Sequence, residues 1–504
     1  MGGVVTVMRE VAEVSQVSKV AKTAAAAEVP AQPVNLATAR VLVAGLGVTG
    51  HAAIEALTPR VARVSTVADD AAADQPMPTD QAAAAALLAD VDLVVTSPGI
   101  PPDSALLSTA VTQGIPVWSE VELAWQLRKE LANPAKWLAV TGTNGKTTTV
   151  GMLESILRAN GERALAVGNV GTPLVTAALD PELDVLAVEL SSFQLHFTHS
   201  MAAQAAAILN IAPDHLDWHG GFENYAADKA KIYRGVEVAG VYNVADPLTE
   251  QLLADAEVTE GARAVGFTLD IPARGNVGVV DDILVDRAFH LPFDTYQREK
   301  SADELATFAD LLHLSTTGGA KPANHIIANA LAAAALARAH GAPLPAIQQG
   351  LRDFAPGSHR IAVVGKHQGV QYVDDSKATN AHAAAASLQA FPAGTVVWLL
   401  GGLAKGAEFD ELVRGNREAL RGAVVIGVDQ QPFIGALSRH APDIPMIVID
   451  PSDTDVMGSA VTAASQLAHP GDTVLLAPAG ASQDQFRSYA HRGEAFTAAV
   501  QGLG

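Results

Sequence analysis

The chain contains no cysteine among its 504 residues. Disulfide bonds, thiolate nucleophiles and cysteine-ligated metals are therefore excluded, and a reducing, cytoplasmic location is expected. Aromatic residues are also scarce, at 5% of the sequence. No uninterrupted apolar run has the length of a membrane span, so the chain is not expected to be embedded in a membrane.

Positive charge is in short supply. Lys and Arg total 33 against 54 Asp and Glu, which gives a formal net charge of -21 at pH 7. Such an acidic chain repels nucleic acids and anionic membranes, so neither is expected as a partner. A phosphorylated substrate would have to be met by local cations and backbone N–H groups.

The length of the chain predicts several domains, because 504 residues exceed what one hydrophobic core usually holds. Residues 1–36 are rich in Ala and Val without a clear period, and they are predicted to be a disordered extension. The segments that follow alternate short apolar strands with Ala-rich helices, a pattern typical of α/β sheets. We expect a Rossmann-like domain over 37–134, a central phosphate-loop domain over 135–355 and a Rossmann-like domain over 356–504.

The strongest motif is GTNGKT at 142–147, between an apolar strand and a helix-like run over 150–160. Strand, glycine-rich loop and helix together are typical of a phosphate-binding loop. Its glycines let backbone N–H groups turn toward phosphate oxygens, and the helix N-terminus adds partial positive charge. Lys146 is expected to reach the β- and γ-phosphates, and the Thr147 hydroxyl is expected to face Mg2+.

Polar residues lie at the ends of other predicted elements. Glu189 comes directly after the apolar strand 185–188, which suits either an Mg2+ ligand or a solvated strand end. His215 follows another strand and is either a metal ligand or a capping residue. Asn329, near the start of an Ala-rich helix, either caps that helix or contacts a base edge.

Lys229 lies on the apolar face of a predicted helix over 222–233, while Asp228 and Lys231 point elsewhere. A lysine on such a face must extend to solvent, find an anion or lose its charge. The residues that share this face are Phe222, Tyr225, Ile232 and Tyr233.

Several motifs occur together in one order: GTNGKT at 142–147, ELSSFQL at 189–195, DHLD at 214–217, HR at 359–360 and DDSKATN at 374–380. From about residue 40 to the C-terminus the chain resembles the Mur ligases, ATP-dependent amino-acid ligases of peptidoglycan synthesis. DSKATN, with ASQDQF at 481–486, resembles the members that add D-glutamate to UDP-N-acetylmuramoyl-L-alanine.

The resemblance implies a three-domain α/β fold and amide-bond formation through an acyl phosphate. It implies ATP, two Mg2+ ions and a carbamylated Lys229. The catalytic residues it implies are Lys146, Asn169, His215 and Lys229. The ATP contacts it implies are Gly142, Thr143, Asn144, Gly145, Lys146, Thr147, Thr148, Asn329, Arg360 and Asp375.

The resemblance also implies the remaining sites. The metal ligands are Thr147, Glu189, His215 and Lys229. The UDP-substrate contacts are Val48, Thr49, Asp69, Ser97 and Asn169. The D-glutamate contacts are Lys377, Thr379, Lys405, Ser482 and Tyr489.

Two positions depart from the family pattern. Ile326 stands where the adenine motif usually has a second Asn, and Gly401–Lys405 lacks the acid that some relatives have there.

Other functions remain open at this stage. The runner-up is another ligase of the same kind, one that adds a different amino acid or glutamate to folate. A phosphate-loop kinase or nucleotide-binding regulator belongs to a different class. The Gly45–Gly50 turn, close to G-x-G-x-x-G, would also fit a dinucleotide-dependent dehydrogenase. A monomer is expected.

Overall fold

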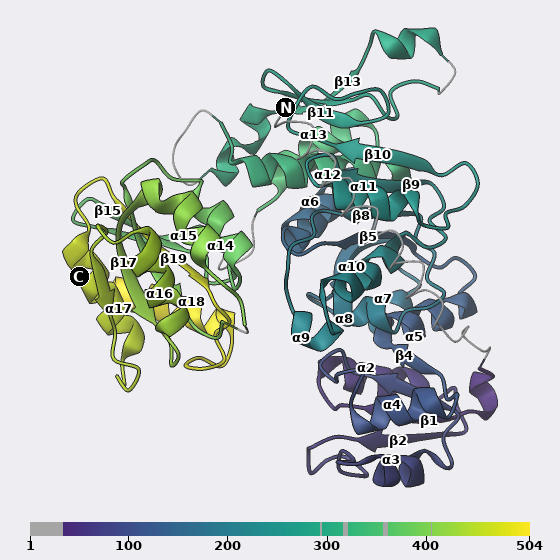
Figure 1. The fold of residues 1–504 in the computed structure, drawn as a ribbon. Coiled ribbons are helices and arrows are strands. Elements are labelled where there is room, and N and C mark those ends of the chain that lie inside the picture. Colours follow the sequence, from purple (N-terminus) through teal and green to yellow (C-terminus); the bar gives the residue numbers. More distant parts are fainter. Residues whose placement is uncertain (1–33, 293–294, 316–320, 356–360, 405, 504) are drawn as a thin grey trace, which may run out of the picture. The chain divides into compact units, whose positions relative to one another are not determined.

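The computed structural model of the protein describes residues 34–292, 295–315, 321–355, 361–404 and 406–503. It is an α/β protein with three sheets, as predicted (Figure 1). The described chain forms two compact units. One holds the residues up to Asp310 together with Ile327–Phe354, and the other holds Leu311–Ile326 together with the residues from Ala355. The bounds of the three predicted domains stay a prediction.

The first sheet has four parallel strands in the order β2-β1-β3-β4. Alternate residues of β1 serve opposite faces, because side chains alternate along a strand. Val41 and Val43 pack with α2 and α5, whereas Leu42 and Ala44 pack with α3 and α4. The elements are β1 (Arg40–Ala44), α2 (Val48–Leu57), β2 (Arg63–Val67), α3 (Gln81–Leu88), β3 (Leu93–Thr96), α4 (Ala105–Thr112), β4 (Val117–Ser119) and α5 (Glu120–Leu127).

The second sheet has nine strands in the order β13-β12-β11-β10-β9-β8-β5-β7-β6. It is parallel from β6 to β11, and β12 and β13 extend it antiparallel. Strand β5 lies between β8 and β7, and after the exposed Lys136 it is buried throughout, as parallel strands covered by helices usually are. The strands are β5 (Lys136–Thr141), β6 (Ala164–Gly168), β7 (Val185–Glu189), β8 (Ala205–Ile208), β9 (Ala239–Asn243), β10 (Arg263–Phe267), β11 (Val277–Val280), β12 (Ile283–Asp286) and β13 (Asp303–Thr307).

The helices of the second sheet are α6 (Lys146–Ala159), α7 (Leu174–Ala178), α8 (Ser192–His196), α9 (Leu216–His219), α10 (Phe222–Ala230), α11 (Pro247–Ala254), α12 (Asn324–His340) and α13 (Leu344–Asp353). Helices α6, α7, α8, α9 and α11 each come after a strand of the second sheet, whereas α10, α12 and α13 come after another helix or a 3-10 turn. Short 3-10 turns complete the chain: η2 (Leu36–Thr38), η3 (Arg128–Glu130), η4 (Lys231–Tyr233), η5 (Tyr296–Glu299), η6 (Phe308–Leu314) and η7 (Arg417–Ala419).

Two predicted helices have different ends in the structure. The helix after the phosphate loop begins at Lys146, not at Val150, because its polar first turn hides the start of the apolar pattern. The predicted helix over 222–233 is divided, since α10 ends at Ala230 and the chain continues as the 3-10 turn η4.

Helix α5 fixes the first sheet against the second. The Trp125 ring lies 5.0 Å from the ring of Trp137 in β5, edge to face. Glu120 Oε1 accepts a hydrogen bond of 2.8 Å from the Val175 N–H of α7. Glu122 Oε2 accepts from the N–H groups of His199 and Ser200, both at 2.8 Å. The first two sheets therefore share one core and belong to one unit.

The third sheet, in the second unit, has the order β14-β15-β19-β16-β17-β18. A hairpin of β14 and β15 forms one edge of this sheet, with Gln368 (φ 48°) and Gly369 (φ 81°) in the turn. Trp398 and Leu475 face α14, α15 and α16, and Leu399 and Leu476 face α17 and α18. The strands are β14 (Ala362–His367), β15 (Val370–Asp374), β16 (Val396–Gly401), β17 (Leu420–Ile426), β18 (Met446–Val448) and β19 (Thr473–Ala479). The helices are α14 (Ala381–Leu388), α15 (Asp410–Asn416), α16 (Gln431–His440), α17 (Val456–Leu467) and α18 (Tyr489–Gln501).

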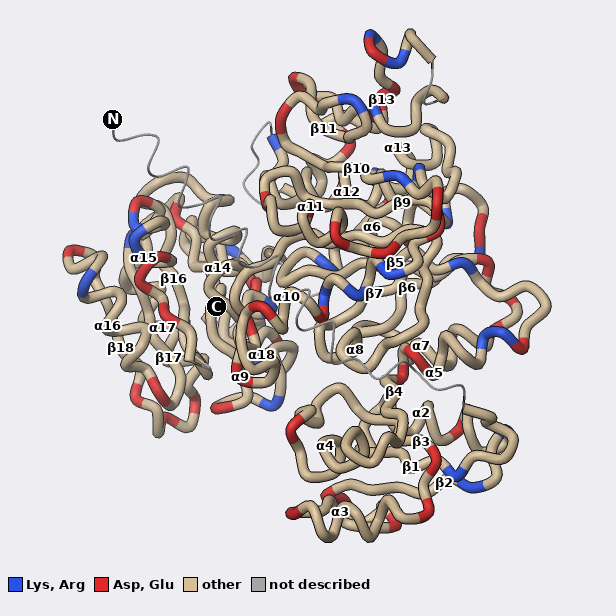
Figure 2. Tube along the Cα trace, turned by 45° about the vertical axis from the view of Figure 1, so that its right-hand side comes forward, with Lys and Arg blue, Asp and Glu red and all other residues tan. Residues whose placement is uncertain are grey.

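Asp and Glu residues are scattered along the backbone traces of both units (Figure 2). None of the helices in the described ranges is long and apolar enough to cross a bilayer.

Candidate active site

The GTNGKT loop joins β5 to α6 and bends at its two glycines. Gly142 has φ 154° and Gly145 has φ 85°, backbone values that favour glycine. Asn210, which follows β8, holds the loop from the neighbouring strand. Its Oδ1 accepts from the Asn144 N–H at 2.9 Å, and its backbone oxygen accepts from the Thr143 N–H at 2.9 Å. The first turn of α6 then carries Lys146, Thr147 and Thr148.

Two lysines converge on one carbonyl oxygen of this loop. Lys146 Nζ donates to the Gly142 oxygen at 2.7 Å and to the Thr143 oxygen at 2.9 Å. Lys229 Nζ donates to the same Gly142 oxygen at 3.0 Å and to Thr141 Oγ1 at 3.3 Å. Two ammonium groups this close repel each other unless an anion joins them or one loses its proton. The geometry therefore favours either an anionic ligand at the loop or one neutral lysine.

Lys229 is 2% exposed, so the extension to solvent that the sequence allowed is wrong. Burial lowers the pKa of Lys229 well below its usual value, and the nearby charge of Lys146 lowers it further. The carboxylates of Asp214, Asp228 and Glu189 oppose this change. Lys229 is thus biased toward the neutral amine, which is the nucleophilic form.

Glu189, the last residue of β7, is 1% exposed, so the solvated strand end is also wrong. Its Oε1 accepts from Asn169 Nδ2 at 2.9 Å. Its Oε2 is buried and has no hydrogen-bond partner among the residues that the structure describes. A buried carboxylate oxygen without a donor is costly unless a cation or a proton meets it. The donor set of Glu189 therefore fits a hard cation such as Mg2+.

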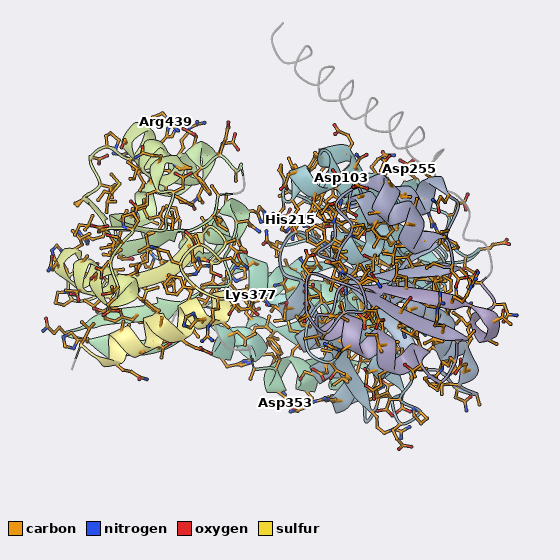
Figure 3. The ribbon with its side chains drawn as sticks, turned by 90° about the horizontal axis from the view of Figure 1, so that it is seen from below. Asp103, His215, Asp255, Asp353, Lys377 and Arg439 are labelled. Atoms are coloured by element: carbon orange, nitrogen blue, oxygen red, sulfur yellow. The ribbon has the colours of Figure 1, made fainter. Side chains whose placement is uncertain are left out.

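His215 lies immediately before α9 with φ 53°, a conformation that is uncommon for residues other than glycine (Figure 3). Its side chain makes no capping hydrogen bond to that helix, so the capping alternative is not observed. The ring lies 4.7 Å from that of Phe193, and Nε2 lies 3.5 Å from Asp214 Oδ1.

Asn329 lies inside α12, which begins at Asn324, so it does not cap that helix. It is 7% exposed and approaches the phosphate loop. Its Oδ1 is 2.5 Å from the position that a Cβ would take on Gly145. Only glycine at position 145 therefore leaves room for Asn329.

Four of the five residues predicted to contact the UDP-substrate lie at one edge of the first sheet, whereas the fifth, Asn169, follows β6 in the second sheet. Val48 and Thr49 open α2 after β1, Asp69 is exposed just beyond β2, and Ser97 follows β3. Ser97 Oγ donates to the Gly45 oxygen at 3.3 Å. The carboxyl ends of neighbouring parallel strands meet at this edge, which is where open α/β sheets bind ligands.

In the second unit, four of the five predicted D-glutamate residues lie beyond β15 and β19. Lys377 Nζ is 5.2 Å from the centre of the Tyr489 ring (Figure 3 labels Lys377). Ser482 is 1% exposed, and its Oγ has no hydrogen-bond partner among the described residues. Thr379 is half-buried in the same segment as Lys377. Asp375 accepts a hydrogen bond from the Ser387 hydroxyl of α14.

Two predicted site residues, Arg360 and Lys405, lie outside the described residues. The roles of all the predicted residues stay predictions.

Sequence reasoning missed Arg492, which joins three loops of the second unit. It is 1% exposed. Its guanidinium donates to Ser376 Oγ at 3.0 Å, to the Ser376 backbone oxygen at 2.9 Å and to the Gly480 oxygen at 3.1 Å. A longer contact of 3.5 Å reaches the Gly401 oxygen. An arginine among the small and apolar residues of α18 was the only sequence signal for it.

Sequence reasoning also gave Tyr225 no polar role. Its hydroxyl lies 2.8 Å from Thr143 Oγ1, and its ring lies 4.8 Å from Lys229 Nζ. Tyr225 thus joins α10 to the phosphate loop. The helical spacing placed the ring on the buried face but did not indicate a partner for its hydroxyl.

Comparisons with known proteins agree with this geometry. Residues 140–337 match the Mur ligase middle domain, and residues 359–480 match the Mur ligase glutamate ligase domain. A UDP-N-acetylmuramoylalanine–D-glutamate ligase of Streptomyces avermitilis is 54% identical over 92% of this chain and 98% of its own length. The enzyme of the same name from Thermobifida fusca is 50% identical, over 92% of this chain and 98% of its own length.

Solved structures share the fold. The UDP-N-acetylmuramate-alanine ligase of Thermotoga maritima is similar with a TM-score of 0.55 at 16% identity, over 92% of this chain and 100% of that one. A MurF ligase from the same organism, in complex with ADP, has a TM-score of 0.52 at 18% identity, over 93% of this chain and 96% of that one.

Proposed function

The chain belongs to the Mur ligase family, and from this premise we propose that it joins D-glutamate to UDP-N-acetylmuramoyl-L-alanine at the expense of ATP. The observation that carries the proposal is the meeting of Lys146 and Lys229 on the Gly142 carbonyl oxygen. Beside it, the second oxygen of Glu189 is buried without a donor among the described residues. Together these groups suit a phosphate with a bound metal ion.

The reaction has two steps. A carboxylate is a poor electrophile, so its oxygen first takes the γ-phosphoryl group of ATP, and ADP leaves. The amine nitrogen of D-glutamate then attacks the carbonyl carbon of the acyl phosphate, loses a proton, and phosphate departs. The barrier falls chiefly through positioning and through cations aimed at the developing charge. In this proposal Lys146 binds the transferred phosphoryl group, and Asn169 orients the substrate carboxylate next to Glu189.

Magnesium fits the donor set at this site. Thr147, Glu189, His215 and a carbamylated Lys229 would hold it, and it would neutralise negative charge on the phosphoryl oxygens. We propose the carbamate because Lys229 is buried and biased toward its neutral form. Its nitrogen bonds to the carbon of CO2 and loses a proton, which leaves an anion with two oxygens. That anion would remove the repulsion between Lys229 and Lys146.

We assign the two substrates to the loops at the ends of the first and third sheets. The carboxyl edge of the first sheet would take the UDP end of the substrate, and the loops after β15 and β19 would take D-glutamate. We further propose that the protein works as a monomer in the cytoplasm.

The test is phosphate release from ATP with UDP-N-acetylmuramoyl-L-alanine and Mg2+. We expect release with D-glutamate, no release with L-glutamate, and a product heavier by one glutamyl residue in mass spectrometry. Release only with another amino acid would identify a different ligase of the family. Phosphate release without any amino acid would indicate a nucleotide hydrolase, ADP formation without phosphate release would indicate a kinase, and nicotinamide-dependent turnover would indicate a dehydrogenase.

A further inference from the structure

Next to Lys229, α10 carries a second buried ionisable residue that the proposed reaction does not use. Asp228 is 5% exposed. Because it is the neighbour of Lys229 on a helix, it points about 100° away around the helix axis, toward α8 and α9 rather than toward the phosphate loop. Its contacts define what we call the Asp228 cluster: Asp228, His196, His219, Ser192 and Lys231.

The Asp228 cluster is a closed set of hydrogen bonds. One oxygen of Asp228, Oδ2, lies 2.7 Å from His196 Nδ1 and 2.8 Å from His219 Nδ1. Its other oxygen lies 3.0 Å from Lys231 Nζ, which also donates to the His196 backbone oxygen at 2.7 Å. The far nitrogen of His219 lies 2.9 Å from Ser192 Oγ. Each ring therefore places an N–H on the carboxylate.

Donors surround both oxygens of the Asp228 carboxylate. His196 and His219 contact one oxygen, and the Lys231 ammonium lies beside the other. A buried carboxylate with this many donors is a rigid anchor, because breaking any one bond leaves a buried charge short of partners. The cluster thus holds its three helices at set distances.

Those three helices follow or carry three of the four predicted metal ligands. Ser192 begins α8, three residues after Glu189. His219 ends α9, which begins directly after His215, and α10 carries Lys229. The Phe193 ring adds a link, since it lies 4.7 Å from the His215 ring and is stacked 5.5 Å from the His219 ring. Glu189 and His215 each precede a short helix, and Lys229 lies on one, so the placement of these helices bears directly on the site.

We propose that Asp228 is a positioning residue: through His196 and His219 it fixes the mutual placement of Glu189, His215 and Lys229. This inference rests on the proposed function. Catalytic groups need placement within about 0.5 Å, and second-layer contacts of metal ligands supply it.

The same three side chains also have the composition of a metal site, since the ligand atoms of His196, His219 and Asp228 lie within 4.8 Å of one another. The hydrogen bonds argue otherwise. The Nδ1 atoms of His196 and His219 both lie at hydrogen-bond distance from the same oxygen of Asp228, and the Lys231 ammonium lies beside the other oxygen. A divalent cation would have to displace both protons next to a fixed positive charge.

The test compares Asp228→Asn with the unmodified protein. We expect kcat to fall about 10- to 100-fold and the Mg2+ concentration for half-maximal rate to rise, while the KM for D-glutamate stays within about twofold. The matched control is Asp286→Asn, which weakens another fully buried carboxylate, bonded to Arg338 at 2.9 Å at the far end of the sheet. The control should lose stability and keep its kcat.

A double-mutant cycle separates positioning from general stability. If Asp228 acts by placing the site around Lys229, the variant that combines Asp228→Asn with Lys229→Ala should be about as slow as Lys229→Ala alone. Losses that multiply would overturn the inference, as would an unchanged kcat in Asp228→Asn. Zinc at one equivalent per chain after treatment with a chelator would also overturn it, because the cluster would then be a metal site.

A second pair of variants covers the case in which Asp228→Asn does not fold. In His219→Gln the side chain can no longer bridge Ser192 and Asp228. We expect kcat to fall here too, but by less than in Asp228→Asn. Its control is His340→Gln, which removes a partly buried histidine bonded to Gln204 at 2.6 Å and to Glu162 at 2.7 Å. Equal rates in these two variants would overturn the inference. If phosphate release required an amino acid other than D-glutamate, the proposed function would fail, yet the same comparisons could be run with that amino acid.

Discussion

Lys229 in the first unit and Arg492 in the second are both buried cations, 2% and 1% exposed, but their surroundings differ. Lys229 shares the Gly142 oxygen with a second ammonium group. Arg492 spreads its charge over the oxygens of Ser376 and Gly480. Burial lowers the pKa of Arg492 only to about 10, with Asp484 and Asp374 opposing the decrease, so it keeps its charge.

The difference shows how one fold makes a rigid frame in one place and a reactive group in another. A guanidinium has five donors in a planar fork and resists deprotonation, so it can hold loops together even when it is buried away from solvent. An ammonium gives up its proton more readily when it is buried next to another cation. The number of hydrogen bonds around a buried charge thus separates a structural residue from a chemical one.

The largest effect is expected when Lys146, the second lysine at the Gly142 oxygen, is removed from beside Lys229. Lys146→Ala should lower the ligation rate about 1,000-fold, because the transferred phosphoryl group loses its main countercharge, while the fold is kept. The measurement is phosphate release together with circular dichroism. Lys129→Ala, on the surface beside Gln126, is the control and should be fully active. Near-normal turnover of Lys146→Ala would refute the phosphate-loop assignment.

The second prediction tests whether Lys229 is reactive rather than structural. Lys229→Ala should lose activity about 100-fold, and acetate or another short carboxylate should restore part of it by standing in for the carbamate. In the unmodified protein, labelled bicarbonate should give a carbamate carbon signal in NMR. Full activity with an unmodified amine would show that the carbamate is not formed.

Glu120 extends the comparison from buried basic residues to a buried acidic one. Its Oε2 is buried without a partner among the described residues. Burial raises the pKa of Glu120 from 4.5 to about 7, although the N–H groups of Val175 and Leu174 oppose the increase. The folded state therefore holds its proton more tightly than the unfolded state. The contribution of Glu120 to the free energy of unfolding should be highest below about pH 4.5 and should fall by about 3 kcal/mol as the pH rises to 7.

Glu120→Gln isolates this contribution, because the amide keeps an acceptor for α7 and cannot ionise. Urea unfolding should show the variant more stable than the parent at pH 8 and similar to it at pH 5. Identical pH profiles would mean that Glu120 is not buried as described. Glu130→Gln, at an exposed ion pair with Arg60, serves as the control.

Arg492→Lys tests the other side of the comparison. The lysine keeps the charge but cannot reach Ser376, Gly480 and Gly401 together, so stability should fall by about 2 kcal/mol. The KM for D-glutamate should rise because the loops after β15 and β19 lose their common anchor. An unchanged melting temperature would contradict the role of Arg492 as a frame.

The smallest effects are expected at the predicted D-glutamate contacts. Lys405→Ala and Thr379→Ala should each raise the KM for D-glutamate about tenfold and leave the KM for ATP nearly unchanged, since a dianionic amino acid needs a cation and hydroxyl donors. Steady-state kinetics with each substrate varied in turn is the measurement. Equal changes in both KM values would argue against a D-glutamate pocket there.

The sequence by itself determined the α/β class, the order of the sheets along the chain and the phosphate loop. These are local properties: a buried parallel strand is a short apolar run, and a phosphate loop is glycines, Lys146 and Thr147 in a row. Helical spacing also placed Lys229 on a buried face together with Tyr225, because that face follows from the period of the helix.

Only the tertiary structure decided which side chains from distant parts of the sequence contact each other. The spacing that sent Asp228 away from Lys229 did not show that it would be buried between His196 and His219, because these three lie on separate helices. The same holds for Lys146 and Lys229, which lie 83 positions apart in the sequence and share one oxygen of Gly142. Burial and the neighbouring charges decide whether a buried ionisable residue is structural or chemically reactive. Both depend on contacts between distant parts of the chain.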